Sequence, residues 1–252
     1  MAWVVLNRPE VRNAISFEMQ AMIPGIMGEL AKDGDVRVIV LTGAGDRAFS
    51  AGADVSEFKQ KRSTAEQAAE HGRLVHAALQ SIAECSKPVI AMINGFAVGN
   101  GYMLAMFCDL RIAADTAKVG ITSSRLGLGG AGAEPSPVTE LLVEMAGPAF
   151  AKEVLLTGRL FTAERAARMG LVNEAVPAAE LEAHTRAVAQ EIAANAPLSV
   201  MGAKASIDAA VQARAGRSRK RRRGAEAPEV TRDAQEGVEA FLAKRRPRFR
   251  GE

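Results

Sequence analysis

Cysteine, histidine and aromatic residues are scarce in this chain, and each shortage excludes a class of function. Two cysteines among 252 residues are too few for a disulfide framework and lack metal-ligand spacing, so Cys85 and Cys108 are expected to be buried, reduced thiols. The three histidines stand in helical patterns with no cysteine or carboxylate cluster beside them, which predicts no metal site. No apolar run reaches the roughly 18 residues of a membrane span, and the first residues lack the pattern of a signal peptide. A cytoplasmic protein without a membrane partner is therefore expected.

What the chain does have is an ordinary globular composition, with 48% hydrophobic and 24% charged residues. A length of 252 residues suits one large α/β domain, or one such domain with a small helical appendage. Because the first residues already read as a core strand, a few residues are expected to be missing upstream. The net charge is unevenly divided: residues 1–213 carry 19 basic and 23 acidic side chains, whereas residues 214–252 carry 13 basic and six acidic ones. The basic pI therefore belongs to the tail.

Short β-branched runs alternate with helical patterns along most of the chain. Strands are expected at residues 4–6, 36–42, 88–94, 110–114 and 172–176. The third of these runs is apolar throughout, which predicts burial on both faces. Helices are expected after Ser16 to about residue 31, and at about residues 64–85, 99–107, 137–146, 148–156, 163–169 and 178–195. Strands that alternate with helices indicate βαβ units and a mostly parallel sheet.

The pattern changes after Pro197 to helices only, which are expected at about residues 197–212 and 231–243. The chain is therefore expected to divide into a core at residues 1–196 and a C-terminal helical region at residues 197–252. A basic segment interrupts this second region, because seven of the ten residues from Arg214 to Arg223 are Lys or Arg.

Two glycine-rich segments carry most of the chemical information. Residues 49–54 (FSAGAD) follow a strand and open a short helix; Gly52 permits close backbone approach and leaves the N–H of Ala53 free to point out of the helix start. Residues 94–102 (NGFAVGNGY) repeat this arrangement, with a helix that begins near residues 99–101. The N–H groups of the first turn of this helix have no intrahelical partner. Each segment alone is compatible with a plain strand-to-helix turn. Two such N–H groups together can hold the oxygen of a thioester as it becomes an anion.

These segments belong to a series of motifs that resembles the crotonase superfamily, also called the enoyl-CoA hydratase/isomerase family. The motifs occur in the order of the family pattern, and the resemblance covers nearly the whole chain. It rests on residues 6–10 (LNRPE) with Asn13 and Ala14, on the two glycine segments, and on residues 108–114 (CDLRIAA), 155–158 (LLTG), 163–167, 170–173 (GLVN) and 236–245.

The resemblance implies an α/β fold in which ββα repeats form a crotonase-type spiral, followed by a C-terminal helical subdomain. It implies an acyl-CoA thioester as substrate, no prosthetic group, and assembly as a homotrimer or a dimer of trimers. The backbone N–H groups of Ala53 and Asn100 would form the oxyanion hole that stabilises an enolate. The family usually has glycine at the second position, and asparagine keeps the N–H. The surface that binds CoA would lie near Ala14, Ala51, Asp54 and Val55, with Lys244 near the phosphates.

The sequence departs from the family pattern where hydratases carry two glutamates that position and activate water. By the same resemblance, these positions fall on Met103 and Ser123, and neither side chain is a useful base near neutral pH. Ser123 itself and Glu134, in a loop about four residues longer than the usual one, are the candidates for an acid–base role. Glu134 precedes Pro135, and a solvated loop carboxylate is the better-supported interpretation of this residue. Tyr102, the single tyrosine, adjoins the second glycine segment but is expected to pack in the core.

The resemblance favours an enoyl-CoA hydratase/isomerase-like lyase of fatty acid metabolism, and two alternatives stay open. A malonyl-type acyl-CoA decarboxylase needs only enolate stabilisation and a proton donor, although decarboxylases of the family carry a loop tyrosine where this chain has Gly130. A non-catalytic acyl-CoA-binding homologue is the other alternative, because the scaffold can persist without the acid–base pair.

The basic segment at residues 214–223 has no interleaved aromatic residues and no nucleic-acid motif, which argues against nucleic acid as a partner. It also lacks the apolar face of the amphipathic helix that the resemblance implies there. A solvated linker is the favoured interpretation of this segment, and contact with the phosphates of CoA is the next.

Overall fold

Two β-sheets form the centre of the computed structural model, which describes residues 1–126, 136–214, 233, 236, 240, 243, 245 and 247–251. The first sheet has five strands in the order β1, β2, β4, β6, β9, with bounds Ala2–Leu6, Ile39–Gly43, Val89–Ile93, Leu110–Ala114 and Glu174–Val176. The second has four strands in the order β3, β5, β7, β8, with bounds Ala48–Ser50, Phe96–Val98, Lys118–Gly120 and Phe161–Thr162. β8 pairs antiparallel with β7, and the other pairs of both sheets are parallel.

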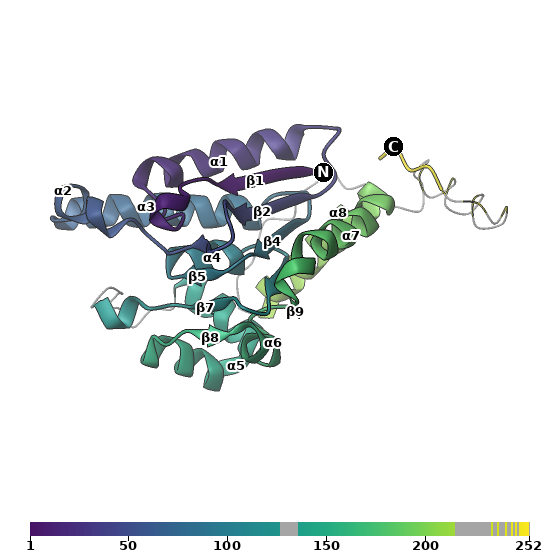
Figure 1. Cartoon of the computed structure of the whole chain (residues 1–252). Coiled ribbons are helices and arrows are strands. Elements are labelled where there is room, and N and C mark those ends of the chain that lie inside the picture. The colour runs from purple at the N-terminus through teal and green to yellow at the C-terminus, as the bar shows by residue number, and fades with distance from the viewer. Residues whose placement is uncertain are drawn as a thin grey trace.

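From β2 to β7 the chain visits the two sheets alternately, and this alternation produces a spiral of ββα repeats (Figure 1). In each repeat one strand joins the first sheet, the next strand joins the second sheet, and helices follow. The helices after β3 are η2 (Val55–Glu57), α2 (Phe58–Lys61) and α3 (Ala65–Ala83); α4 (Asn100–Met106) follows β5, and η3 (Ser123–Leu126) and α5 (Pro137–Thr157) follow β7. The α/β spiral expected from the sequence is therefore confirmed.

The remaining helices lie around the two sheets. α1 (Phe17–Lys32) packs against α3, while α7 (Leu181–Ala194) packs against β4 and β6. α6 (Ala163–Arg168) lies beside β8 at the lower end of Figure 1, together with α5. The other described helices are η1 (Pro9–Val11), η4 (Ala178–Glu180) and α8 (Pro197–Arg214). Every residue of β2 and β4 is buried, which confirms the burial expected for the apolar run at residues 88–94.

Several predicted helix boundaries agree with the structure, but the strands of the second sheet were not predicted. Ser16 caps α1 as expected, because its side chain accepts a hydrogen bond from the Met19 N–H at 3.2 Å. α5 replaces two expected helices, but it bends at Gly147, where φ is +76°, and this is the position of the expected break. The sequence predicts none of the four short strands of the second sheet. The helix expected at residues 231–243 and the basic segment after Arg214 lie outside the described residues, apart from isolated positions.

Candidate active site

The two glycine-rich turns and Ser123 lie where three strands of the second sheet end. β3, β5 and β7 are parallel neighbours, with Ser50 paired to Ala97 and Val98 paired to Gly120. The carboxyl ends of these strands therefore meet at one edge of the sheet. Both glycine-rich turns and Ser123 follow directly at this edge.

The first turn leaves the backbone N–H of Ala53 without a partner. Ile15 and Ala53 form an isolated parallel bridge, in which the Ile15 N–H donates to Gly52 O at 2.8 Å and the Asp54 N–H donates to Ile15 O at 2.9 Å. Because successive N–H groups of an extended chain point to opposite sides, the Ala53 N–H points away from Ile15. It donates to no other residue in the described part of the chain. Gly52 has φ +103°, a conformation that favours glycine.

The second turn leaves the N–H of Asn100 free in the same way. Gly99 has φ +53° and ψ −123°, and its N–H donates to Gly120 O at 2.9 Å. Asn100 is the first residue of α4, and the first intrahelical bond here runs from the Met103 N–H to Gly99 O, at 2.9 Å. The Asn100 N–H has no partner among the described residues, as the first turn of a helix requires.

The two turns are in direct contact. A Cβ atom added to Gly52 would lie 2.8 Å from Val98 O and 3.8 Å from the Asn100 nitrogen. A Cβ atom added to Gly101 would lie 2.6 Å from the Ser50 Cβ. The structure thus brings together two turns whose N–H groups are free, although they are almost 50 residues apart in the sequence.

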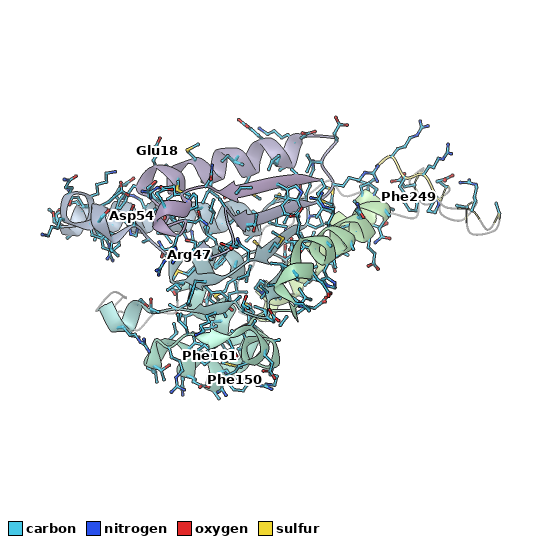
Figure 2. The ribbon with its side chains drawn as sticks, in the orientation of Figure 1. Glu18, Arg47, Asp54, Phe150, Phe161 and Phe249 are labelled. Carbon is cyan, nitrogen blue, oxygen red and sulfur yellow. The ribbon has the colours of Figure 1, made fainter. Side chains whose placement is uncertain are left out.

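A loop from Arg8 to Ile15 borders the first turn. The Arg8 Nη1 donates to Ala14 O at 2.9 Å and to the Asp54 Oδ2 at 2.8 Å, and the Ala51 N–H donates to Arg12 O at 2.9 Å. Ala14, Ala51 and Asp54 therefore lie together beside Val55, whose side chain is exposed. Figure 2 shows Asp54 near the start of α1, on the opposite side of the molecule from Phe249. Lys244 lies outside the described residues.

Asn13 holds this loop in place, a role that its sequence motif does not predict. Its side chain is fully buried, accepts from the Arg8 N–H at 3.0 Å, and donates to Ala44 O at 2.9 Å and to Ala48 O at 2.8 Å. Its φ of +55° lies in the left-handed region, which asparagine tolerates better than most residues. The sequence signal was an asparagine beside the LNRPE motif, but its partners are 31 and 35 residues away.

Asp54 is held in its ionised form. Its Oδ1 accepts from the Ser56 hydroxyl at 2.5 Å and from the Ser56 N–H at 3.2 Å, so Asp54 caps η2. These hydrogen bonds from Ser56, together with that from Arg8, lower the pKa of Asp54 below its ordinary value of 3.8. The carboxylate therefore joins the loop that precedes α1 to the turn that carries Ala53.

The depressed pKa of Asp54 makes the contribution of Arg8 to stability dependent on pH. A carboxyl group with a lowered pKa in the folded state stabilises the protein above its unfolded pKa, and this stability is lost as the pH falls. Arg8→Met is expected to lower the free energy of unfolding by up to about 1 kcal/mol above pH 5, and by progressively less as the pH falls below the ordinary pKa of 3.8. Urea unfolding across this pH range measures the difference.

Arg47→Met is the matched control for this experiment, because Arg47 is exposed and forms no ion pair in the described part of the chain. It makes the same change of charge away from Asp54. An Arg8→Met deficit that stays constant with pH, or that Arg47→Met reproduces, would contradict the assigned role of the ion pair.

Met103 and Ser123 lie at the same edge of the second sheet. Met103 is half-buried, packs against the core, and stands one helical turn after Asn100 on α4. Ser123 is the first residue of η3, and its hydroxyl makes no hydrogen bond within the described ranges. Neither residue brings a carboxylate to the turns. Glu134 lies outside the described residues.

Tyr102 packs in the core, as expected. Its ring is fully buried, and its hydroxyl donates to Leu171 O at 2.9 Å. Burial raises the pKa of Tyr102 far above its ordinary value of 10.0, so the phenol stays protonated. Its hydroxyl is thus committed to the interior.

Tyr102→Phe is expected to lower the free energy of unfolding by about 1–2 kcal/mol, because Leu171 O then loses its buried donor. Affinity for acyl-CoA is expected to stay the same. Chemical denaturation and calorimetric titration with butyryl-CoA test the two halves of the prediction. A variant that keeps its stability but loses acyl-CoA affinity would instead place the hydroxyl at the ligand.

The whole chain, residues 1–252, matches the family model described as enoyl-CoA hydratase/isomerase. The chain belongs to the enoyl-CoA hydratase/isomerase family. This assignment confirms the resemblance noted from the sequence motifs. Enoyl-CoA hydratases of this family use CoA thioesters as substrates.

Named relatives match this family member over nearly its full length. A crotonyl-CoA hydratase of Syntrophomonas wolfei is 36% identical, and the match covers 99% of this chain and 94% of the relative. An (E)-benzylidenesuccinyl-CoA hydratase of Thauera aromatica is 38% identical, with coverage of 100% and 96%. The solved structure of an enoyl-CoA hydratase/carnithine racemase from Magnetospirillum magneticum superposes with a TM-score of 0.87 at 36% identity, with coverage of 99% and 92%.

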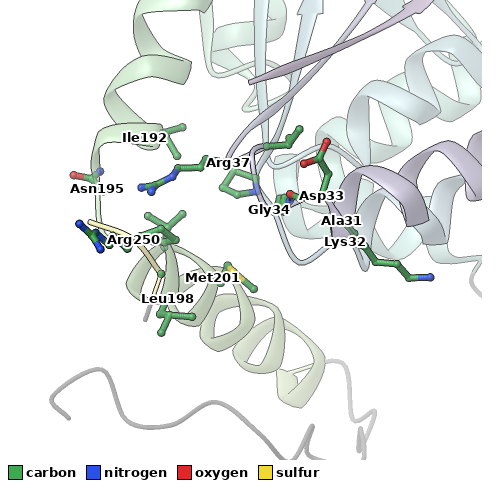
Figure 3. Close-up of a pocket in the computed structure, with 16 residues that line it drawn as sticks. Ala31, Lys32, Asp33, Gly34, Arg37, Ile192, Asn195, Leu198, Met201 and Arg250 are labelled. Carbon is green, nitrogen blue, oxygen red and sulfur yellow. The ribbon is translucent and has the colours of Figure 1, made fainter. Parts of the chain in front are cut away.

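A cavity of about 230 Å³ lies away from the two turns of this enoyl-CoA hydratase/isomerase family member. Figure 3 shows it between the end of α1, Arg37 before β2, the start of α8 and Arg250. It therefore opens near the amino ends of β2 and β4, whereas the turns follow the carboxyl ends of strands. None of the described residues among those proposed for the site lines it.

The described residues contain no cluster of three or more His, Cys, Asp or Glu side chains placed to hold a metal ion. They also contain no helix that is both long and apolar enough to cross a membrane.

Proposed function

We propose that this protein binds an acyl-CoA thioester and stabilises its enolate between the backbone N–H groups of Ala53 and Asn100. The observation that carries the proposal is the pair of free N–H groups on two turns that touch at one edge of the second sheet. Membership of a family that acts on CoA thioesters supplies the ligand. The backbone of both turns is fixed by hydrogen bonds on either side of each free N–H.

Such a pair of donors acts on the carbonyl oxygen of the thioester. Attack at C3 of an enoyl thioester, or loss of a group from C2, moves an electron pair onto this oxygen, and both N–H groups then hold the charge. Each preorganised donor of this kind contributes about 10²–10³ in rate in well-studied enzymes. The N–H groups are already oriented before the substrate arrives, so little reorganisation is needed.

The CoA moiety is proposed to lie along Ala14, Ala51, Asp54 and Val55. These residues are contiguous beside the first turn, and the exposed Val55 offers apolar surface next to it. Lys244 is the proposed contact for the phosphates.

Hydration of an enoyl-CoA is the favoured reaction, because relatives whose match covers nearly the whole chain are named as hydratases. Ser123 and Glu134 are the proposed acid–base residues. Glu134 would take a proton from a water molecule as the water oxygen bonds to C3. The protonated carboxyl group would then give a proton to C2 as the enolate collapses. The proposed assembly is a homotrimer or a dimer of trimers in the cytoplasm, with the chain divided near residue 197.

Decarboxylation of a malonyl-type thioester is the second candidate, and one observation favours it. The two positions at which hydratases carry glutamates hold Met103 and Ser123. Loss of CO₂ leaves its electron pair on the enolate and needs only a proton donor afterwards, so a site without a base can still perform it. A non-catalytic acyl-CoA-binding protein is the remaining alternative, because a site that lacks both glutamates can still bind the thioester without turning it over.

Turnover of crotonyl-CoA, followed by loss of the enoyl thioester absorbance, tests the proposed reaction. Glu134→Gln is expected to lower the rate by about 10²-fold or more if Glu134 is the base, and Ser123→Ala reports the part played by the hydroxyl. A preparation from a host strain lacking its own hydratase sets the background. Binding without turnover would exclude hydration and direct the assay to malonyl-CoA.

A further inference from the structure

Asn100 brings a side-chain amide to the second turn in addition to its backbone N–H. Its Nδ2 exposes less than 1 Å² to solvent and has no hydrogen-bond partner in the described structure. Buried amide groups are nearly always hydrogen-bonded, because removing such a donor from water without a partner is costly. An unpartnered buried donor at a binding site therefore indicates a ligand that supplies the acceptor.

The periodicity of α4 places this amide on the side of the proposed thioester site. Most residues of α4 are buried, but Asn100, Met103 and the C-cap residue Phe107 are partly exposed at spacings of three and four, so they share one face of the helix. Side chains of a helix lean toward its N-terminus. The amide of the first residue therefore extends toward the turn that carries Ala53.

The backbone and the side chain of Asn100 are consequently able to contact different atoms of one ligand. If the backbone N–H of Asn100 holds the thioester oxygen, C2 and C3 of the acyl group lie close to the side-chain amide of the same residue. The side chain of Met103 offers no hydrogen-bond donor on this face of α4, so the Asn100 amide supplies the donor there. A saturated acyl chain would leave the amide without an acceptor.

We infer that the Asn100 amide donates a hydrogen bond to an oxygen that the acyl group carries at C3. The substrate class is then an acyl-CoA with a carboxylate or keto oxygen at this position, as in malonyl-type and 3-oxoacyl thioesters. This class fits the second candidate reaction, decarboxylation, rather than hydration of an enoyl-CoA, whose C3 carries no oxygen. This inference rests on the proposed function, since it takes the thioester to be held by the Asn100 N–H. Asn100 is thus a specificity-determining residue as well as a backbone donor.

The test compares binding of malonyl-CoA and butyryl-CoA, whose acyl groups have nearly the same length, by calorimetric titration with the ligands checked for integrity afterwards. The wild-type protein is expected to bind malonyl-CoA at least about tenfold more tightly, the effect of one hydrogen bond to a charged acceptor. Asn100→Leu keeps the shape and the backbone N–H but removes the donor, and should bring the ratio of the two affinities to about one. Asn100→Asp replaces the donor with an anion and should reverse the preference.

Acetoacetyl-CoA separates an oxygen acceptor from a negative charge, because its keto group is neutral. Its affinity should also exceed that of butyryl-CoA in the wild-type protein and lose this advantage in Asn100→Leu. Equal binding of all three ligands, or a preference that both variants retain, overturns the inference while leaving the proposed function intact. Failure of the wild-type protein to bind any of them contradicts the proposed function itself.

Discussion

Gly101→Ala is expected to lower the free energy of unfolding by about 1–3 kcal/mol and to weaken binding of butyryl-CoA by about tenfold or more. The new methyl group would lie 2.6 Å from the Ser50 Cβ and 2.8 Å from Ser50 O. Ser50 is fully buried in β3, so its backbone cannot move aside cheaply. The two turns must separate instead, which displaces the Asn100 N–H relative to that of Ala53. Urea unfolding and calorimetric titration measure the two effects.

Gly72→Ala is the matched control for this variant. Gly72 also lies in a helix, α3, but an added Cβ atom would meet nothing within 4 Å. Replacement there is expected to stabilise the protein by about 0.5–1 kcal/mol, because alanine is the better helix former, and to leave acyl-CoA affinity unchanged. If Gly101→Ala behaved like Gly72→Ala, the close contact between the two turns would not matter for binding.

Met103→Glu combined with Ser123→Glu is expected to raise the rate of crotonyl-CoA hydration by about 10²–10⁴-fold. Met103 lies on α4, and Ser123 begins η3 three residues after the end of β7. If the family resemblance places these positions correctly, carboxylates there would be able to position water and accept its proton. The gain should follow a carboxyl titration, with activity rising as the pH passes the pKa of the new base. Initial rates across pH 4–9 give both the magnitude and the profile.

The corresponding double variant with glutamines, Met103→Gln with Ser123→Gln, controls for size and polarity. It should fold similarly and remain at the background rate, since an amide cannot accept the proton of water. An equal gain in both double variants would mean that the carboxylates do not act as bases. No gain in a folded glutamate variant would contradict the placement of these positions at the thioester.

The first sheet could be predicted from the sequence, and the second could not, for a physical reason. β2, β4 and β6 are runs of five residues that are almost entirely buried, so hydrophobicity marks them. β3, β5, β7 and β8 have two or three residues each, and no periodicity shows at this length. Their pairing depends on contacts between distant segments, which local patterns do not contain.

In the candidate site, too, features set by local sequence could be predicted, whereas features that depend on distant contacts could not. The turns at Gly52 and Gly99 were predictable because a positive φ favours glycine, and both glycines have one. The roles of Arg8 and Asn13 were not, because their partners Asp54 and Ala48 are 46 and 35 residues away. The unpartnered amide of Asn100 likewise became visible only with the burial of its Nδ2. Local sequence gives the turns, and the three-dimensional structure gives what holds them together.

The carbonyl ¹³C resonance of [1-¹³C]butyryl-CoA tests the central claim most directly, because it reports polarisation of the thioester without requiring turnover. If the N–H groups of Ala53 and Asn100 both donate to the carbonyl oxygen, the resonance of the bound ligand moves downfield of the free one, and the displacement is reduced in Gly101→Ala. A bound ligand whose carbonyl resonance stays at its free position would contradict the account.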